Sequence, residues 1–71
     1  MATPVNPKLV GTIVSIDVKV GDQVKKNDVL GSMEAMKMNI KIFAPMEGTI
    51  QEIYVKPGDP VNPKVAILTL E

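Results

Sequence analysis

The chain of 71 residues contains no Cys, His, Trp or Arg. These absences remove the usual zinc ligands, the imidazole general base and the thiol nucleophile at once. We therefore expect neither a metal site nor catalysis of its own, and an enzyme is the least favoured interpretation. Without Cys, the sequence carries no information about the redox compartment.

Charge and hydropathy also narrow the choice of partners. Eight Lys balance eight Asp plus Glu, so the net charge favours neither nucleic acid nor an anionic membrane surface as a partner. No apolar run resembles a signal peptide or a membrane span. The sequence predicts a cytoplasmic protein with no direct membrane insertion.

Length predicts one small domain over residues 1–71. A domain of this size buries only about 60% of the surface that its unfolded chain exposes, which leaves no room for a deep catalytic cleft. Residues 1–7 contain Pro4 and Pro7. They suit either a first edge strand or the end of a linker, and the sequence does not separate the two.

The two halves of the chain repeat one another. A shift of 37 positions aligns residues 11–34 with residues 48–71 and gives ten identities, among them Gly-Thr-Ile and Gly-Asp. Two similar halves that cannot each bury their apolar face must pack on one another. The repeat therefore predicts a sandwich with pseudo-two-fold symmetry.

Each half has the pattern of β-structure and no helical period. A β-branched run is followed by a Gly-Asp turn, a short segment around Val24 or Val61, and a second apolar run. In both halves two Ile residues lie three positions apart, which breaks strict alternation and predicts a β-bulge. The long runs cover residues 12–20, 29–34, 49–55 and 65–70.

If the first copy is taken to end at Glu34 and the second to start at Met38, the junction between them holds only Ala35, Met36 and Lys37. The next segment, Met38 to Phe43, alternates and should be a half-exposed strand. A three-residue connection between strands predicts a tight hairpin with Lys37 at its tip. Because these residues lack the usual Asn-Gly or Asp-Gly signature, a functional constraint on them is a reasonable hypothesis.

Only two aromatic residues are present, so the predicted core is aliphatic. The predicted core residues are Ile13, Ile16, Val18, Val29, Leu30, Ile50, Ile53, Val55, Ile67 and Leu68.

The segment Glu34-Ala35-Met36-Lys37-Met38 resembles the attachment motif of biotinyl domains, the biotin carboxyl carrier domains of carboxylases and decarboxylases. The resemblance covers almost the whole chain, since the Gly-Thr and Gly-Asp pairs and the segment 44–49 also fall where the family has them. It implies a flattened β-barrel of two four-stranded antiparallel sheets. It also implies biotin, held by an amide bond to Lys37, as a mobile carrier of a carboxyl group.

Some family members carry a thumb loop before the Gly-Asp turn, but here residues 13–20 run into Gly21-Asp22 without an insertion. The chain is thus more similar to the thumbless carriers of pyruvate carboxylase, transcarboxylase and decarboxylase complexes than to the classical bacterial acetyl-CoA carboxylase carrier. The implied partners are a biotin protein ligase and the biotin carboxylase and carboxyltransferase or decarboxylase components. The isolated domain should be a monomer.

The residues around the lysine have implied roles as well. Met36 and Met38 are unbranched and polarizable, which suits contacts with several enzyme surfaces. By resemblance they also help to place Lys37 for carboxyl transfer, and Glu34 and Ala35 contribute to recognition by the ligase.

Two other functions stay open. A lipoyl domain shares the hairpin lysine but typically has Asp before it and Ala after it, whereas Met36 and Met38 stand there in this chain. An unmodified interaction module with the same sandwich fold is the second alternative. Such a module would not need a lysine flanked by two methionines.

Overall fold

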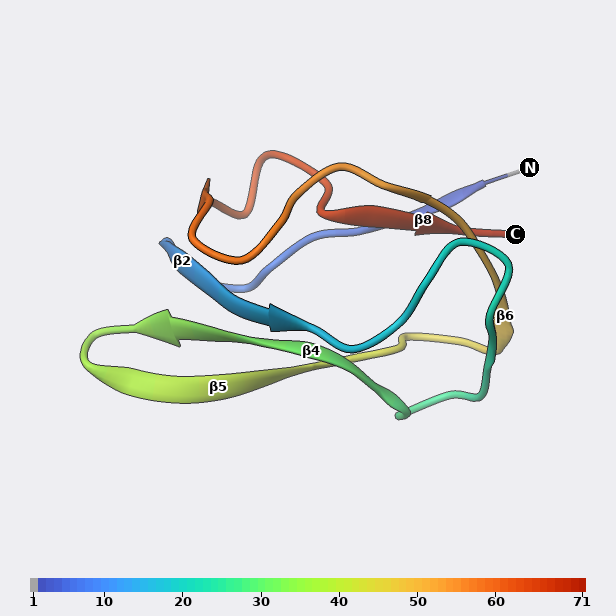
Figure 1. Cartoon of the computed structure of the whole chain (residues 1–71), viewed down its shortest axis with the longest axis horizontal. Helices are drawn as coiled ribbons and strands as arrows, with labels where there is room; N and C mark the ends of the chain where they lie inside the picture. The colour runs from blue at the N-terminus through green and yellow to red at the C-terminus, as the bar shows by residue number, and fades with distance from the viewer. Residues whose placement is uncertain (1) are drawn as a thin grey trace.

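The computed structural model describes residues 2–71 (Figure 1). It confirms an all-β fold, and within these residues no helix is long and apolar enough to cross a membrane. The eight strands are β1 (Thr3–Val5), β2 (Gly11–Ile16), β3 (Gln23–Val24), β4 (Val29–Ala35), β5 (Met38–Phe43), β6 (Gly48–Ile53), β7 (Pro60–Val61) and β8 (Leu68–Leu70).

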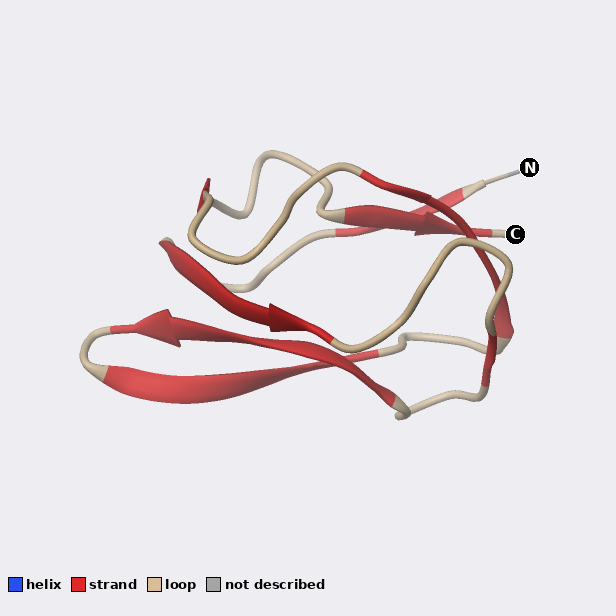
Figure 2. Ribbon diagram, in the orientation of Figure 1, coloured by secondary structure: helices blue, strands red, loops and turns tan. Residues whose placement is uncertain are grey.

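The strands form two four-stranded antiparallel sheets, with the orders β1-β8-β6-β3 and β5-β4-β2-β7 (Figure 2). The 37-residue shift places β2 on β6, β3 on β7 and β4 on β8, and β1 takes the position of β5. Each sheet therefore has the same internal order. The predicted pseudo-two-fold sandwich of two four-stranded sheets is confirmed.

The Gly-Asp turn of each half bonds to the first long strand of the other half. The amide of Gly21 donates to the carbonyl of Ile50 at 2.8 Å, and the amide of Ile50 donates to the carbonyl of Asp22 at 2.8 Å. The pair Gly58–Asp59 makes the same two bonds with Ile13, at 2.8 and 2.9 Å. These reciprocal bonds join the two halves.

Within each turn the glycine and the aspartate have separate tasks. Gly21 has a φ of 96° and Gly58 a φ of 95°, a region that side chains with a Cβ rarely adopt. The carboxylate of Asp22 accepts a hydrogen bond from the Lys19 amide at 2.9 Å, and Asp59 makes the equivalent bond at 3.0 Å. The prediction that these pairs are scaffold turns fits this geometry.

Both predicted bulges are present, as register shifts between Ile13 and Ser15 and between Ile50 and Glu52. The predicted run over residues 12–20 was too long, because β2 ends at Ile16. The backbone amide of Asp17 still donates to the carbonyl of Leu30 at 2.9 Å. The chain then leaves this sheet, and at Gly21 it bonds to Ile50 in the other sheet. The segment 65–70 is likewise a strand only from Leu68.

The buried core is aliphatic, as predicted, but its membership differs in part. Val29 is 38% exposed and was wrongly placed in the core. The prediction treated Val29 and Leu30 as one apolar run, but a register shift between Val29 and Gly31 buries Leu30 and Gly31 and leaves Val29 on the outer face. Four predicted members are only partly buried, namely Ile16, Val18, Ile53 and Val55. The hydrophobic core residues that were not predicted are Val5, Val24, Met33, Ala35, Ile42, Ala44, Val61 and Leu70.

The N-terminal segment supplies an edge strand. Residues Thr3–Val5 pair antiparallel with β8 along Thr3 to Leu70 and Val5 to Leu68. The edge-strand alternative therefore holds for these three residues. Met1 lies outside the described residues.

Candidate functional site

The β4–β5 hairpin ends at the tip of the molecule farthest from both chain ends (Figure 1). The longest dimension of the domain is 32 Å, so the tip is well separated from the termini. Its turn contains two residues, Met36 and Lys37, and the pair Ala35–Met38 closes it. The predicted three-residue connection was wrong, because Ala35 pairs in β4 and is buried.

The backbone of the turn is strained. Met36 has a φ of 54° and Lys37 a φ of 64°, and positive φ at both central residues is the mark of a type I′ hairpin turn. Such a turn matches the twist of the flanking strands but normally uses Asn-Gly. For residues with a Cβ the left-handed region costs roughly 1–2 kcal/mol each. This cost supports the hypothesis of a functional constraint.

Replacing Met36 by a residue that tolerates positive φ should relieve part of this strain. We expect Met36→Asn to raise the free energy of unfolding by about 1 kcal/mol, because the short polar side chain of Asn is accommodated in the left-handed region. Urea unfolding measures the change. Met46→Asn is the matched control, since Met46 has no positive φ. An equal gain in both variants would contradict the strain argument.

The side chains at the tip divide into an exposed group and a buried group. Met36 and Met38 are 77% and 55% exposed, and Lys37 and Glu34 are also exposed. Ala35 is only 3% exposed. Four of the five predicted motif residues are thus presented to partners, whereas the side chain of Ala35 faces the core.

A tightly packed base holds the tip in place. Met33 and Ala35 anchor the end of β4 in the core. A Cβ on Gly11 of β2 would meet the backbone carbonyl of Glu34, and the Met33 Cε would lie 2.8 Å from it. Gly11 therefore allows β2 to approach β4 just before the turn. Sequence reasoning missed this role, although the repetition of Gly11 at Gly48 was a usable signal.

The two-residue turn carries one reactive group, the exposed primary amine of Lys37. Among residues 2–71 no group of three or more Asp or Glu could hold a metal ion. An unhindered amine on a rigid tip can accept an acyl group and then carry it on a mobile arm. Fold and tip together define a carrier-type sandwich domain with a lysine in a strained hairpin turn.

Comparison with known proteins gives the family. The family model described as "Biotin-requiring enzyme", for biotin and lipoyl attachment, matches residues 3–70. The chain belongs to this family. The chain is 38% identical over 61 residues to pyruvate carboxylase of Bacillus subtilis, covering 86% of this chain and 5% of that protein.

Two smaller relatives match over most of the chain. The biotin carboxyl carrier protein of Streptococcus mutans is 43% identical over 60 residues, 84% of this chain and 46% of that protein. The biotinylated protein TB7.3 homolog of Mycobacterium leprae is 36% identical over 62 residues, 87% of both chains. The chain thus spans less than half of the first two relatives and most of the third.

Solved structures show the same fold. Urea carboxylase of Kluyveromyces lactis superposes with a TM-score of 0.91 and 25% identity over 100% of this chain and 6% of that chain. The lipoyl domain of the 2-oxoglutarate dehydrogenase complex from Azotobacter vinelandii gives a TM-score of 0.75 and 26% identity over 100% and 92%. Biotin and lipoyl carriers share this architecture, so the fold alone does not choose between them.

Proposed function

We propose that this chain is a biotin carboxyl carrier domain with biotin attached to the Nζ of Lys37. The observation that carries the proposal is the strained two-residue turn of Met36 and Lys37 at the tip farthest from the termini. The biotin-named relatives support biotin over lipoate as the attached group. The domain itself is a non-catalytic carrier.

Each residue of the tip has a task in attachment. The neutral Lys37 amine would attack the carbonyl of a biotinyl adenylate and lose one proton to solvent as the amide bond forms, and AMP would leave with the electron pair of the broken anhydride bond. Met36, Met38 and Glu34 are exposed around the amine and offer the contacts that a biotin protein ligase would use. Buried Ala35 fixes the end of β4 and so orients the amine.

Once bound, biotin supplies a ureido nitrogen that carries carboxylate between two active sites. The chain keeps that ring near both sites, because a short flexible tether gives effective concentrations roughly in the millimolar range. The partners proposed are biotin protein ligase, biotin carboxylase, and a carboxyltransferase or decarboxylase component. A monomeric state for the isolated domain and a cytoplasmic location belong to the same proposal.

Intact mass after incubation with biotin ligase, ATP and biotin tests the attachment. The expected gain is one biotin less one water for the parent chain and none for Lys37→Arg. Lys41→Arg is the matched control, because Lys41 is an exposed lysine on the same hairpin, and it should be modified like the parent. Failure of the parent with biotin ligase and success with a lipoate ligase would replace biotin by lipoate.

A further inference from the structure

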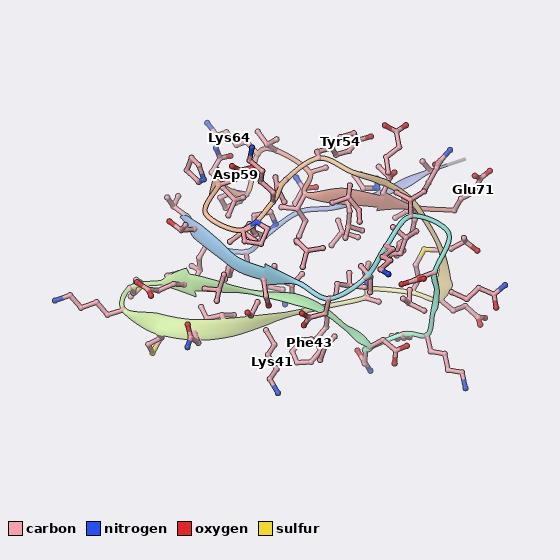
Figure 3. All side chains as sticks on the ribbon, in the orientation of Figure 1. Lys41, Phe43, Tyr54, Asp59, Lys64 and Glu71 are labelled. Atoms are coloured by element: carbon pink, nitrogen blue, oxygen red, sulfur yellow. The ribbon has the colours of Figure 1, made fainter. Side chains whose placement is uncertain are left out.

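A groove of about 400 Å³ runs along the open edge of β5. Residues 5–9, which lead from β1 toward β2, form one wall, and residues 40–45 form the other. Its volume lies within the range of small-molecule sites, about 300 to 1,000 Å³. Figure 3 shows Lys41 and Phe43 on the β5 side, directed away from the opposite sheet.

The lining of the groove favours an apolar ring with an electron-rich edge. Leu9 is 39% exposed and Phe43 52% exposed, and Ile40 is half-buried, so apolar surface is available in its walls. The charged residues that line it are Lys8 and Lys41, and no acidic residue does so. Two ammonium groups attract a carbonyl oxygen or a carboxylate at the rim.

The attachment site lies within reach of this groove. The groove begins at the cross-strand pair Met33–Ile40. Ile40 is three residues from Lys37, which is about 10 Å along a strand. About eleven bonds separate the Cα of a biotinylated lysine from the bicyclic ring, and they span roughly 14 Å when extended. A ring carried by Lys37 can therefore enter the groove at its near end.

We propose that this groove binds the bicyclic ring of biotin attached to Lys37, so that the arm rests against its own domain between visits to other active sites. The inference depends on the proposed biotinylation of Lys37. The apolar walls would cover the thioether side of the ring, and the positive charge of Lys8 and Lys41 at the rim would attract its ureido side, which becomes anionic on carboxylation. Because the ring is tethered, a weak contact is enough to hold it.

Methyl NMR of the unmodified and the biotinylated domain tests the inference directly. The turn must respond to modification in any case, so the informative signals are Leu9 and Val5, on the wall formed by another segment. We expect shift changes there, together with nuclear Overhauser effects between ring protons and the Leu9 methyls. Val24 and Val61, outside the groove, should not change. Changes confined to residues 34–40 would overturn the inference.

Capture by streptavidin gives a second readout that needs no enzyme activity. If the ring spends half to nine-tenths of its time in the groove, releasing it should speed capture by about twofold to tenfold. Leu9→Ser should have this effect. Val65→Ser, an exposed valine outside the groove, should not. Equal capture rates in the two variants and the parent would also overturn the inference.

The two proposals fail in different ways. A chain that gains no biotin mass refutes attachment at Lys37, and the groove then loses its occupant. A chain that gains the mass, but shows no response at Leu9 or Val5, keeps its carrier function and refutes only the resting position of the arm.

Discussion

Ile50→Ala lowers the free energy of unfolding by about 2–5 kcal/mol, the usual cost of removing most of a large buried aliphatic side chain. Ile50 is 1% exposed and lies next to the bulge of β6. Its backbone amide donates to the carbonyl of Asp22, and its carbonyl accepts from the amide of Gly21, in the turn of the other half. Urea unfolding measures the loss of free energy, provided that the dependence of this free energy on urea concentration is the same in parent and variant.

Two further alanine variants make this result specific. Ile13→Ala should cost about as much as Ile50→Ala, since Ile13 is its repeat partner and is also 1% exposed. Ile53→Ala should cost clearly less, because Ile53 is only partly buried. Equal losses at Ile50 and Ile53 would show that the packing differs from the structure described here. Unequal losses at Ile13 and Ile50 would show that the halves are not energetically equivalent.

The features that the repeat shares between both copies were predictable from the sequence. The spacing of Ile13 and Ile16 recurs in the second half, and both halves contain the bulge that it implies. The Gly-Asp pairs likewise occupy matching turns. The position of Lys37 between the copies followed from the same comparison, because the residues between the end of the first copy and the start of the second must form the connection. These inferences needed periodicity and no knowledge of side-chain packing.

The features that depend on contacts between sheets were not predictable in this way. β2 ends at Ile16 because the chain must cross to the other sheet, and β-propensity carries no signal for that crossing. Val29 faces outward, opposite Phe43, because of a register shift within β4. The β5 groove needs residues 5–9 to lie beside β5, and these segments are far apart in the sequence.

The type I′ turn lies between these two cases. Propensity could not predict it, since Met36 and Lys37 are poor choices for positive φ. The mismatch between the hairpin required by the repeat and the residues found there was nevertheless visible in the sequence. The positive φ values show that the mismatch is backbone strain in the turn. Residues that lower stability in this way indicate a functional constraint.

Gly31→Ala should destabilise the domain by about 3 kcal/mol, an overpacking effect at the upper end of the usual range. An added Cβ would meet the carbonyl oxygen of Ser15 and would lie 3.2 Å from the Cα of Ile16. Both contacts are with backbone, which cannot move aside as a flexible side chain can. The substitution must therefore push β2 away from β4, in the sheet that carries the hairpin.

Gly21→Ala separates this effect from the ordinary cost of replacing a glycine. Gly21 has a φ of 96° and no atom within 4 Å of its would-be Cβ. Its replacement should cost about 1–2 kcal/mol from backbone strain alone. Chemical denaturation of both variants gives the comparison. A smaller loss for Gly31→Ala than for Gly21→Ala would mean that β2 and β4 yield easily, and the base of the hairpin would then not hold Lys37 rigidly.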